Sequence, residues 1–331
     1  MSAGQEQLDV RTALKRGIAE LRDANVPSYT LAAELLLLHA LGRDRAWLYA
    51  HPDEILPGLD GHRYLSLILR RADGEPTQYI TGKQEFWSLN FEVTPDVLIP
   101  RPETEHVIEV ALDRLALREL RAGRPQKNDG TGLRVADVGT GSGCIIIALA
   151  NELPVAHFVA TDISPVALVV AQRNATRHQV AGRIQFVKCN LLEDITTSMV
   201  GAQHAAPLQL QAGTVVATRE SPVTSHQSLL FDLIVSNPPY IGRNEKETLA
   251  REVRDHEPEI ALYGGEEGYE IYADLIAQAA RALMPSGILV LELGHNGLPT
   301  VQPLLDAPAW TNVGVTNDLA GIPRVIAAEK V

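Results

Sequence analysis

From residue 133 to the end of the chain, short apolar segments alternate with segments of helical periodicity. Two parallel strands can be joined only by a crossover, usually a helix, so this alternation predicts a doubly wound α/β sheet that is mostly parallel. Two further candidate strands close the chain and bring the predicted sheet to seven strands. The predicted strands cover residues 133–138, 157–161, 184–188, 231–236, 287–293, 313–316 and 325–328.

The first part of the chain has a different pattern. From residue 8 to residue 73, apolar residues recur every three or four positions, and one such segment stops at Gly42, a residue type that often ends a helix. We predict a small helical bundle over residues 1–75 as a substrate-binding domain. A connector over 76–130 with a β-hairpin and a helix follows, and then a catalytic domain over 131–331.

The hairpin of the connector is predicted within residues 86–98. The segment FWSLNFEVTPDVL partly alternates apolar and polar residues, as a half-buried hairpin does. Its Thr-Pro-Asp sequence is a turn signal.

Residues 196–228 interrupt the alternation of strands and helices. Small and polar residues dominate this segment, and no period is sustained. A segment of this composition cannot bury a core, so we predict a flexible insertion that is dispensable for catalysis.

Charge and composition exclude several classes of protein. The 331 residues include 29 Lys and Arg against 41 Asp and Glu, and the net charge of −12 opposes non-specific binding to nucleic acid or to an anionic membrane. We expect a cytoplasmic protein, because the N-terminus lacks the apolar core of a signal peptide and no apolar run reaches membrane-spanning length. The only cysteines, Cys144 and Cys189, lack metal-ligand spacing, which favours two buried free thiols without a disulfide or a metal.

The first predicted strand of the sheet runs into the glycine-rich sequence DVGTGSGC. Glycines at such a turn let the backbone approach a nucleotide, and the following helix offers unpaired N–H groups. About twenty residues later, a carboxylate ends the next strand, where it can accept hydrogen bonds from both ribose hydroxyls. A nicotinamide cofactor would suit this pair equally, and tight packing of strand against helix would also require glycine. The candidate cofactor-binding residues are Gly139, Thr140, Gly141, Ser142, Gly143 and Asp162.

The fourth predicted strand ends in Asn-Pro-Pro-Tyr, residues 237–240. Taken alone, Asn-Pro is a turn signal. In a doubly wound sheet, however, ligands bind at the carboxyl ends of the strands, where this sequence falls. Nicotinamide enzymes have no reason to place it there, so it favours a different cofactor.

In order and spacing, these motifs resemble class I S-adenosylmethionine-dependent methyltransferases that act on planar nitrogen and carry Asn/Asp-Pro-Pro-Tyr/Phe after strand four. Four more segments are similar to the glutamine-N5 methyltransferases of class 1 peptide-chain release factors: GEPTQYITGKQEFW, LIPRPETE, EPEIALYGGEEG and LELG. The resemblance covers nearly the whole chain except residues 196–228. It implies a Rossmann-like fold, S-adenosylmethionine as cofactor, and as substrate the glutamine in the Gly-Gly-Gln loop of a release factor, without direct nucleic-acid binding. A sister family that methylates a ribosomal-protein glutamine shares Asn-Pro-Pro-Tyr, but the segment 101–105 favours the release-factor branch.

The resemblance also assigns roles to the residues after strand four. The side-chain oxygen of Asn237 and the carbonyl of Pro238 would each accept one N–H of the substrate amide, while Pro238 and Pro239 fix the backbone. Asn237 also borders the cofactor site. Tyr240 would pack against the planar amide, or serve only as wall packing.

Three further assignments follow from position. The family usually has an acidic residue near the end of strand three for the adenine amino group, and Asn190 and Leu191 occupy that region here. The Asn190 side-chain oxygen can still accept a hydrogen bond. Arg101 and Glu103 are expected at the mouth of the site, or paired with each other in a salt bridge.

Two other functional classes remain. An adenine-N6 DNA methyltransferase uses the same four-residue motif but needs a basic groove, and the charge of −12 and a bundle without a basic stripe argue against it. A non-enzymatic binding module would be expected to lose parts of the site. The core motif is complete, which favours catalysis.

Overall fold

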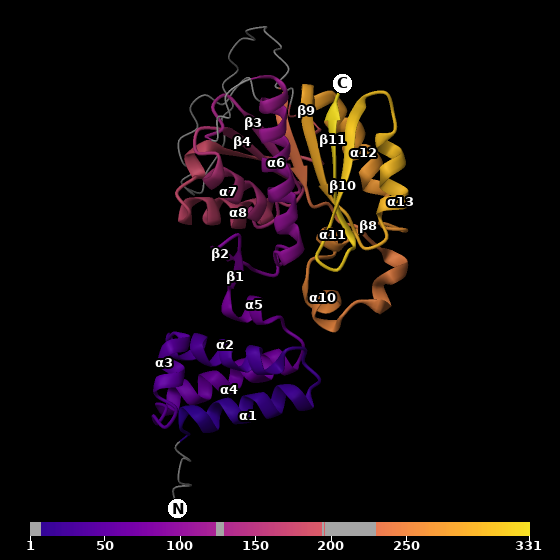
Figure 1. The fold of residues 1–331 in the computed structure, drawn as a ribbon. Coiled ribbons are helices and arrows are strands. Elements are labelled where there is room, and N and C mark those ends of the chain that lie inside the picture. Colours follow the sequence, from indigo (N-terminus) through magenta and orange to yellow (C-terminus); the bar gives the residue numbers. More distant parts are fainter. Residues whose placement is uncertain (1–7, 124–128, 194, 196–229) are drawn as a thin grey trace, which may run out of the picture.

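The computed structural model describes residues 8–123, 129–193, 195 and 230–331. A helical bundle at the amino end is joined by a short hairpin to an α/β domain (Figure 1). The predicted insertion over residues 196–228 lies outside the described residues.

The bundle packs its apolar side chains into a core of its own. Leu36 and Leu37 of one helix meet Tyr64 and Ile68 of another in this core, and all four side chains are fully buried. The second helix ends at Gly42, whose φ of +62° is the left-handed conformation that glycine adopts without strain, so this predicted helix end is confirmed. The helices are α1 (Val10–Asp23), α2 (Tyr29–Leu41), α3 (Arg45–Ala50) and α4 (Gly58–Ala72), followed by the short α5 (Thr77–Thr81).

The connecting hairpin exists, but its turn is not where the sequence placed it. Strands β1 (Lys83–Phe86) and β2 (Leu89–Glu92) are joined at Trp87 and Ser88, with φ of +52° and +58°. Positive φ at both central residues is typical of a two-residue type I′ turn. The Thr-Pro-Asp sequence follows the second strand instead. The prediction was wrong because neither turn residue is Gly, Asn or Asp, the usual signals for this turn.

The α/β domain contains a seven-stranded sheet with the order β10-β11-β9-β6-β3-β4-β5. All pairs from β5 to β9 are parallel, and β11 runs antiparallel to both of its neighbours. The predicted fold class, a doubly wound and mostly parallel sheet of seven strands, is confirmed. The strands are β3 (Arg134–Val138), β4 (His157–Asp162), β5 (Ile184–Lys188), β6 (Phe231–Ser236), β9 (Leu283–Glu292), β10 (Trp310–Asn317) and β11 (Pro323–Lys330).

Helices cover both faces of the sheet, as the alternation of strand residues requires. Val135 of β3 belongs to the core beneath α6, α7 and α8, whereas its neighbour Ala136 belongs to the core beneath α12. Leu233 and Ile234 of β6 divide in the same way. The remaining elements of the domain are η1 (Pro102–Thr104), α6 (Glu105–Arg121), α7 (Cys144–Glu152), α8 (Pro165–Arg177), η2 (Ala181–Arg183), β7 (Ile241–Gly242), η3 (Arg243–Thr248), α10 (Arg251–His256), α11 (Glu259–Leu262), β8 (Tyr263–Gly265), α12 (Glu270–Ala282), α13 (Leu298–Val301) and η4 (Gln302–Leu305).

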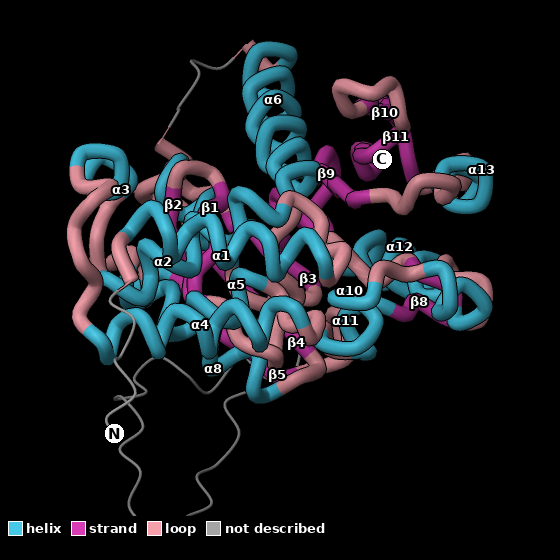
Figure 2. The backbone as a smooth tube through the Cα atoms, turned by 90° about the horizontal axis from the view of Figure 1, so that it is seen from below, coloured by secondary structure: helices cyan, strands magenta, loops and turns pink. Residues whose placement is uncertain are grey.

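The bundle rests against the segment that follows β6. Figure 2, seen from below, shows the bundle helices in front of the sheet domain, with α10 to one side of them. Arg71 on α4 forms a hydrogen-bonded ion pair with Glu252 on α10, and Asp73 pairs with Arg251 at 3.0 Å. The helical domain is therefore tied to the loop region beyond the Asn-Pro-Pro-Tyr sequence.

The two cysteines differ in burial. Cys144 is buried at the start of α7, but Cys189 is only half-buried, and its thiol donates to the Leu191 carbonyl at 3.3 Å. The prediction of two buried thiols was wrong for Cys189 because this residue follows β5, the edge strand of the sheet. Within the described part of the chain, no group of three metal-binding side chains is arranged to hold an ion. No described helix combines the length and apolar character needed to cross a membrane.

Candidate active site

A pocket lies at the topological switch point of the sheet, where β3 is flanked by β4 on one side and β6 on the other. Its volume of about 250 Å³ far exceeds the ~10–15 Å³ that one water needs, so it can hold a ligand. The glycine turn, the ends of β4, β5 and β6, the connector and α11 all contribute to its wall. The predicted site residues in this lining are Arg101, Gly139, Thr140, Gly141, Ser142, Asp162, Asn190, Leu191, Asn237, Pro238 and Pro239; Glu103, Gly143 and Tyr240 lie outside it.

The three glycines after β3 have different structural roles. Gly139 and Gly141 have φ of +72° and +53°, and a Cβ added to either would meet no atom of the described residues within 4 Å. They therefore leave open space along the pocket. Gly143 has φ of +82°, and its added Cβ would lie 2.9 Å from Ile147 and 3.2 Å from Ala171. Gly143 thus serves the packing of α7 against α8 rather than the pocket surface.

Asp162 holds the shape of the glycine turn. One carboxylate oxygen accepts the Gly141 N–H at 2.9 Å, and the other accepts the Ser164 N–H at 2.8 Å. Burial raises the pKa of Asp162, and these backbone hydrogen bonds oppose that rise by stabilising the charged form. The side chain lines the pocket, so its remaining lone pairs face a ligand in that space.

Asp137, the residue before this turn's Val138, was not assigned a role from the sequence. It is fully buried, and the Thr140 hydroxyl donates to its Oδ2 at 2.7 Å. Among the described residues no partner is found for its Oδ1. Burial, assisted by the charge of Asp162, raises its pKa to about 7. The only sequence signal for it was a carboxylate inside an apolar strand.

The opposite wall is formed by the Asn-Pro-Pro sequence after β6. The Ser236 hydroxyl donates to the Val138 carbonyl at 2.7 Å and so holds the end of β6 beside the end of β3. Asn237 follows, and its Nδ2 donates to the Thr104 hydroxyl oxygen at 3.0 Å. Since the amide nitrogen is committed to Thr104, the amide oxygen is the group that Asn237 offers to the pocket that it lines.

Behind this wall lies Glu292, which the sequence indicated only as part of LELG. It is 1% exposed, and burial raises its pKa to about 7. The Tyr240 hydroxyl donates to its Oε1 at the long distance of 3.4 Å, and the nearby Thr104 hydroxyl opposes the rise of its pKa. Among the described residues no hydrogen-bond partner is found for its Oε2. Tyr240 also packs so closely on Gly294 that a Cβ there would come within 2.8 Å of its ring. Tyr240 therefore supports the wall from behind.

Two pocket residues have partners that the sequence did not predict. Arg101 donates to Glu257 at 2.6 Å and lines the pocket, while Glu103 is exposed, so the alternative of a salt bridge between Arg101 and Glu103 is not observed. The reason is the fold, which brings Glu257 back against the connector. Asn190 donates through Nδ2 to Glu193 at 3.0 Å, which leaves its side-chain oxygen as the acceptor for a ligand.

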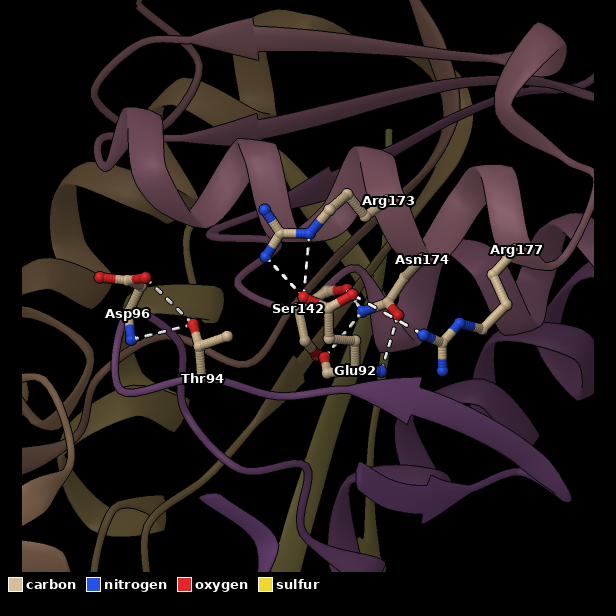
Figure 3. Close-up of polar contacts among 7 residues, drawn as sticks. All are labelled: Glu92, Thr94, Asp96, Ser142, Arg173, Asn174 and Arg177. Atoms are coloured by element: carbon tan, nitrogen blue, oxygen red, sulfur yellow. Dashed lines mark hydrogen bonds and ion pairs between the residues drawn. The ribbon is translucent and has the colours of Figure 1, made fainter. Parts of the chain in front are cut away.

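One buried side chain fastens the hairpin to the glycine turn (Figure 3). Asn174 on α8 donates to the carbonyls of Glu92 and Ser142 at 2.9 Å each, and accepts the Glu92 N–H at 2.7 Å. The Glu92 side chain pairs with Arg173 at 2.6 Å and with Arg177 at 3.7 Å. The connector is thus anchored to the glycine turn, which lines the pocket.

Nearly the whole chain is similar in sequence to proteins of one family. A release factor glutamine methyltransferase of Koribacter versatilis is 40% identical over 98% of this chain and 99% of that protein. Another, from Nitratidesulfovibrio vulgaris, is 39% identical over 96% of this chain and 94% of that protein. This chain belongs to the release factor glutamine methyltransferase family. Two family models also match: the PrmC N-terminal domain over residues 12–82, and a methyltransferase domain over residues 129–205.

Membership of the release factor glutamine methyltransferase family fits the arrangement of the chain. The PrmC N-terminal domain match covers the bundle, and the methyltransferase domain match covers the glycine turn and Asp162. Among solved structures, the hMettl16 catalytic domain, solved in complex with MAT2A 3′UTR hairpin 6, is similar with a TM-score of 0.50 and 17% identity over 81% of each chain. At that identity the similarity concerns the methyltransferase fold alone.

Proposed function

We propose that this protein transfers a methyl group from S-adenosylmethionine to the side-chain amide nitrogen of the glutamine in the Gly-Gly-Gln loop of class 1 peptide-chain release factors. The observation that carries the proposal is the Asn237 amide, which lines the same pocket as the glycine turn and is held by Thr104 with its oxygen available. The names of the relatives support the same substrate.

One wall of the pocket, formed by the glycine turn, Asp162 and Asn190 and called the cofactor wall here, fits S-adenosylmethionine. Gly139 and Gly141 leave room for a ligand to approach the backbone, and Asp162 presents carboxylate oxygens to the ribose hydroxyls. The Asn190 oxygen is placed to accept from the adenine amino group, a role in which the family usually has an acid. When bound, the cofactor supplies a methyl group on a positively charged sulfur.

The opposite wall, formed by residues 237–239 and called the acceptor wall here, must make a reaction possible at a poor nucleophile, the glutamine amide nitrogen. The lone pair of a carboxamide nitrogen is delocalised into the carbonyl, so the amide must be held with that lone pair directed at the methyl group. The Asn237 oxygen and the Pro238 carbonyl each accept one substrate N–H, and two prolines keep both acceptors in place. Positioning of this kind is worth roughly 7–11 kcal/mol in favourable cases.

The same two acceptors favour the transition state over the ground state. Positive charge grows on the nitrogen as the new bond forms, and hydrogen-bond acceptors stabilise that charge better than the neutral amide. A positively charged amide nitrogen readily releases its proton, so the site needs no strong general base.

We propose that the bundle binds the body of the release factor. In this proposal residues 1–75 form the substrate-binding domain, 76–130 the connector and 131–331 the catalytic domain. In support of this role, the ion pairs of Arg71 and Asp73 join the bundle to α10, in the segment that follows the Asn-Pro-Pro-Tyr sequence. The net charge of −12 disfavours DNA as an alternative substrate.

The test is intact-mass analysis of a purified release factor after incubation with enzyme and S-adenosylmethionine, followed by peptide mapping. We expect a gain of one methyl group on the glutamine of the Gly-Gly-Gln loop. The matched control is the same release factor with that glutamine replaced by alanine. Methylation of a ribosomal protein or of DNA instead, with no change in the release factor, would reject the proposed substrate.

A further inference from the structure

Three polar side chains from distant segments meet at the acceptor wall: Thr104 and Asn237, which line the pocket, and the buried Glu292 behind them. Thr104 ends η1, Asn237 follows β6, and Glu292 ends β9. Ser236 and Leu291 are paired across the parallel strands, so the next residue of each strand, Asn237 and Glu292, lie at the same edge of the sheet. Thr104 is 2% exposed, its hydroxyl oxygen accepts from Asn237 at 3.0 Å, and its hydroxyl lowers the pKa of the neighbouring Glu292 carboxyl.

The hydroxyl of Thr104 does not cap helix α6, although Thr104 precedes that helix. Thr104 occupies the N-cap position of α6, where a threonine usually accepts a backbone N–H of the first turn. Within the described chain it makes no such capping bond. Its hydroxyl instead accepts from Asn237 and lies beside the Glu292 carboxyl, which indicates a role other than capping.

The hydrogen-bonding capacities of Glu292, Thr104 and Asn237 determine which group donates and which accepts. An ionised carboxylate only accepts hydrogen bonds, and a threonine hydroxyl has one proton to donate. When that proton goes to Glu292, the Thr104 oxygen can only accept from Asn237. The Asn237 amide must then turn its NH₂ group to Thr104, and its oxygen faces the pocket.

We propose that Glu292 and Thr104 form a positioning relay that fixes which end of the Asn237 amide faces the substrate. The inference rests on the proposed function and deepens it, because the orientation matters only if the substrate is a donor such as a glutamine amide. Glu292 and Thr104 are positioning residues, since both act through Asn237. A reversed Asn237 would present its NH₂ group to the substrate NH₂ group, and two donors cannot bond each other.

Glu292 also makes the relay sensitive to pH. The groups that face it are Arg324 on β11, Glu103 on η1 and the hydroxyl of Tyr240, while the Tyr272 hydroxyl of α12 donates to its backbone carbonyl at 2.6 Å. Burial and Glu103 raise the pKa of Glu292 to about 7, whereas Thr104, Arg324 and Tyr240 oppose the rise. A protonated Glu292 can donate to Thr104, and the hydroxyl can then donate to Asn237 and reverse its amide. The relay therefore holds its orientation above a pH of about 7 and loses it below.

The first experiment measures single-turnover methylation of a release factor by Thr104→Val, which replaces the hydroxyl with a methyl group of similar size. We expect the rate to fall roughly 10- to 100-fold, the effect of leaving a buried donor unpaired, with little change in KM for the release factor or in S-adenosylhomocysteine affinity. Thr104→Ser retains the hydroxyl and should recover most of the rate. The matched control, Thr77→Val, removes another buried threonine hydroxyl in α5 and should retain the wild-type rate.

Coupling to Asn237 distinguishes the relay from a purely structural role. In an Asn237→Ala background, Thr104→Val should cause almost no further loss, because the group through which it acts is absent. Thermal melting checks that each variant folds, and Thr104→Ala replaces Thr104→Val if the valine is not accommodated. A wild-type rate in a folded Thr104→Val or Thr104→Ala enzyme, or fully additive losses in the double variant, would overturn the relay.

The second experiment follows the single-turnover rate from pH 6 to pH 9. The wild-type rate should fall as the pH drops through about 7, and Glu292→Gln, which cannot titrate, should lose this acid limb. An unchanged acid limb in Glu292→Gln would reject the assignment of the titration to Glu292. If the wild-type protein methylates no release factor at any pH, the proposed function fails and the relay falls with it. If it does methylate, only the relay is at stake in these variants.

Discussion

The two walls of the pocket are built in different ways. The cofactor wall comes from strands that follow one another in the chain, β3 with its turn, β4 and β5, and its key contacts join residues fairly close in the sequence, such as Asp137 with Thr140 and Gly141 with Asp162. The acceptor wall is assembled from three distant segments, and the bond between Asn237 and Thr104 joins residues 133 positions apart. The first wall is therefore a local motif, whereas the second exists only once the sheet has formed.

The walls nevertheless share one feature, a buried carboxyl group beside a threonine hydroxyl that lowers its pKa. Asp137 with Thr140 and Glu292 with Thr104 both follow this pattern, and burial raises the pKa of each acid to about 7. In the cofactor wall the pair lies within the turn and shapes it. In the acceptor wall the pair is connected to Asn237 and orients it. The same chemistry thus has a structural role on one side and a proposed catalytic consequence on the other.

The largest expected effect concerns the acceptor wall. Asn237→Ala should lower the methyl-transfer rate by roughly 3–4 kcal/mol, typical of losing one preorganised electrostatic partner, because the substrate amide loses an acceptor. Cofactor affinity should change little. Asn237→Asp keeps an acceptor but loses the donor to Thr104, so an intermediate rate is expected. Single-turnover kinetics with thermal melting provide the measurement. A folded Asn237→Ala enzyme with wild-type turnover would show that the Asn-Pro-Pro-Tyr sequence is only a turn without a role in methyl transfer.

The next prediction concerns the buried acid of the cofactor wall. The ordinary pKa of Asp137 is near 3.8 and its pKa in the folded protein is about 7. Between these values the folded state binds more protons than the unfolded state, so Asp137 lowers the free energy of unfolding as the pH rises from about 4 to 7. Asp137→Asn removes this contribution. Relative to wild type, its free energy of unfolding should rise by on the order of 2–3 kcal/mol between pH 5 and pH 8.

Urea denaturation at the two pH values measures this change. Asp306→Asn, a change of an exposed aspartate, serves as the matched control and should show no such difference. If Asp137→Asn loses stability relative to wild type as the pH rises, the acid is ionised in the folded protein and the similarity between the two walls breaks down.

A smaller effect separates binding from chemistry. Asp162→Ala removes the carboxylate proposed to hold the ribose and also releases the Gly141 and Ser164 N–H groups. Charge-assisted hydrogen bonds of this kind contribute about 1.5–3 kcal/mol, so isothermal titration should show S-adenosylhomocysteine binding weakened roughly 10- to 100-fold. The rate at saturating cofactor should stay near wild type. A loss confined to that rate would place Asp162 on the acceptor side instead.

This difference between the walls explains what could be predicted from the sequence. The glycine turn, the acid at the end of β4 and Asn-Pro-Pro-Tyr can be recognised in the sequence, and the fold brings the turn, the acid and residues 237–239 to one pocket. Thr104 and Glu292 could not be assigned, because neither residue type nor spacing indicates which strands become neighbours. The partner of Arg101 could not be predicted for the same reason, since Glu257 lies 156 residues away. The hairpin turn at Trp87 was missed because its residues lack the usual turn chemistry.

The smallest expected effect tests how far the acceptor wall extends behind the pocket. Tyr240→Phe removes only the hydroxyl, whose 3.4 Å contact with Glu292 is at the long limit of a hydrogen bond. Thr104 still bonds Glu292, so the relay should keep its direction and the rate should remain within about threefold of wild type, less than the ~1 kcal/mol of an average hydrogen bond. Tyr240→Ala removes the ring that packs on Gly294 and should lower the melting temperature as well as the rate. Comparison of the two variants by single-turnover kinetics and thermal melting separates the hydroxyl from the ring. A Tyr240→Phe loss as large as that of Thr104→Val would make the hydroxyl a third member of the relay, and the segment after β6 would then contribute both Asn237 and Tyr240 to it.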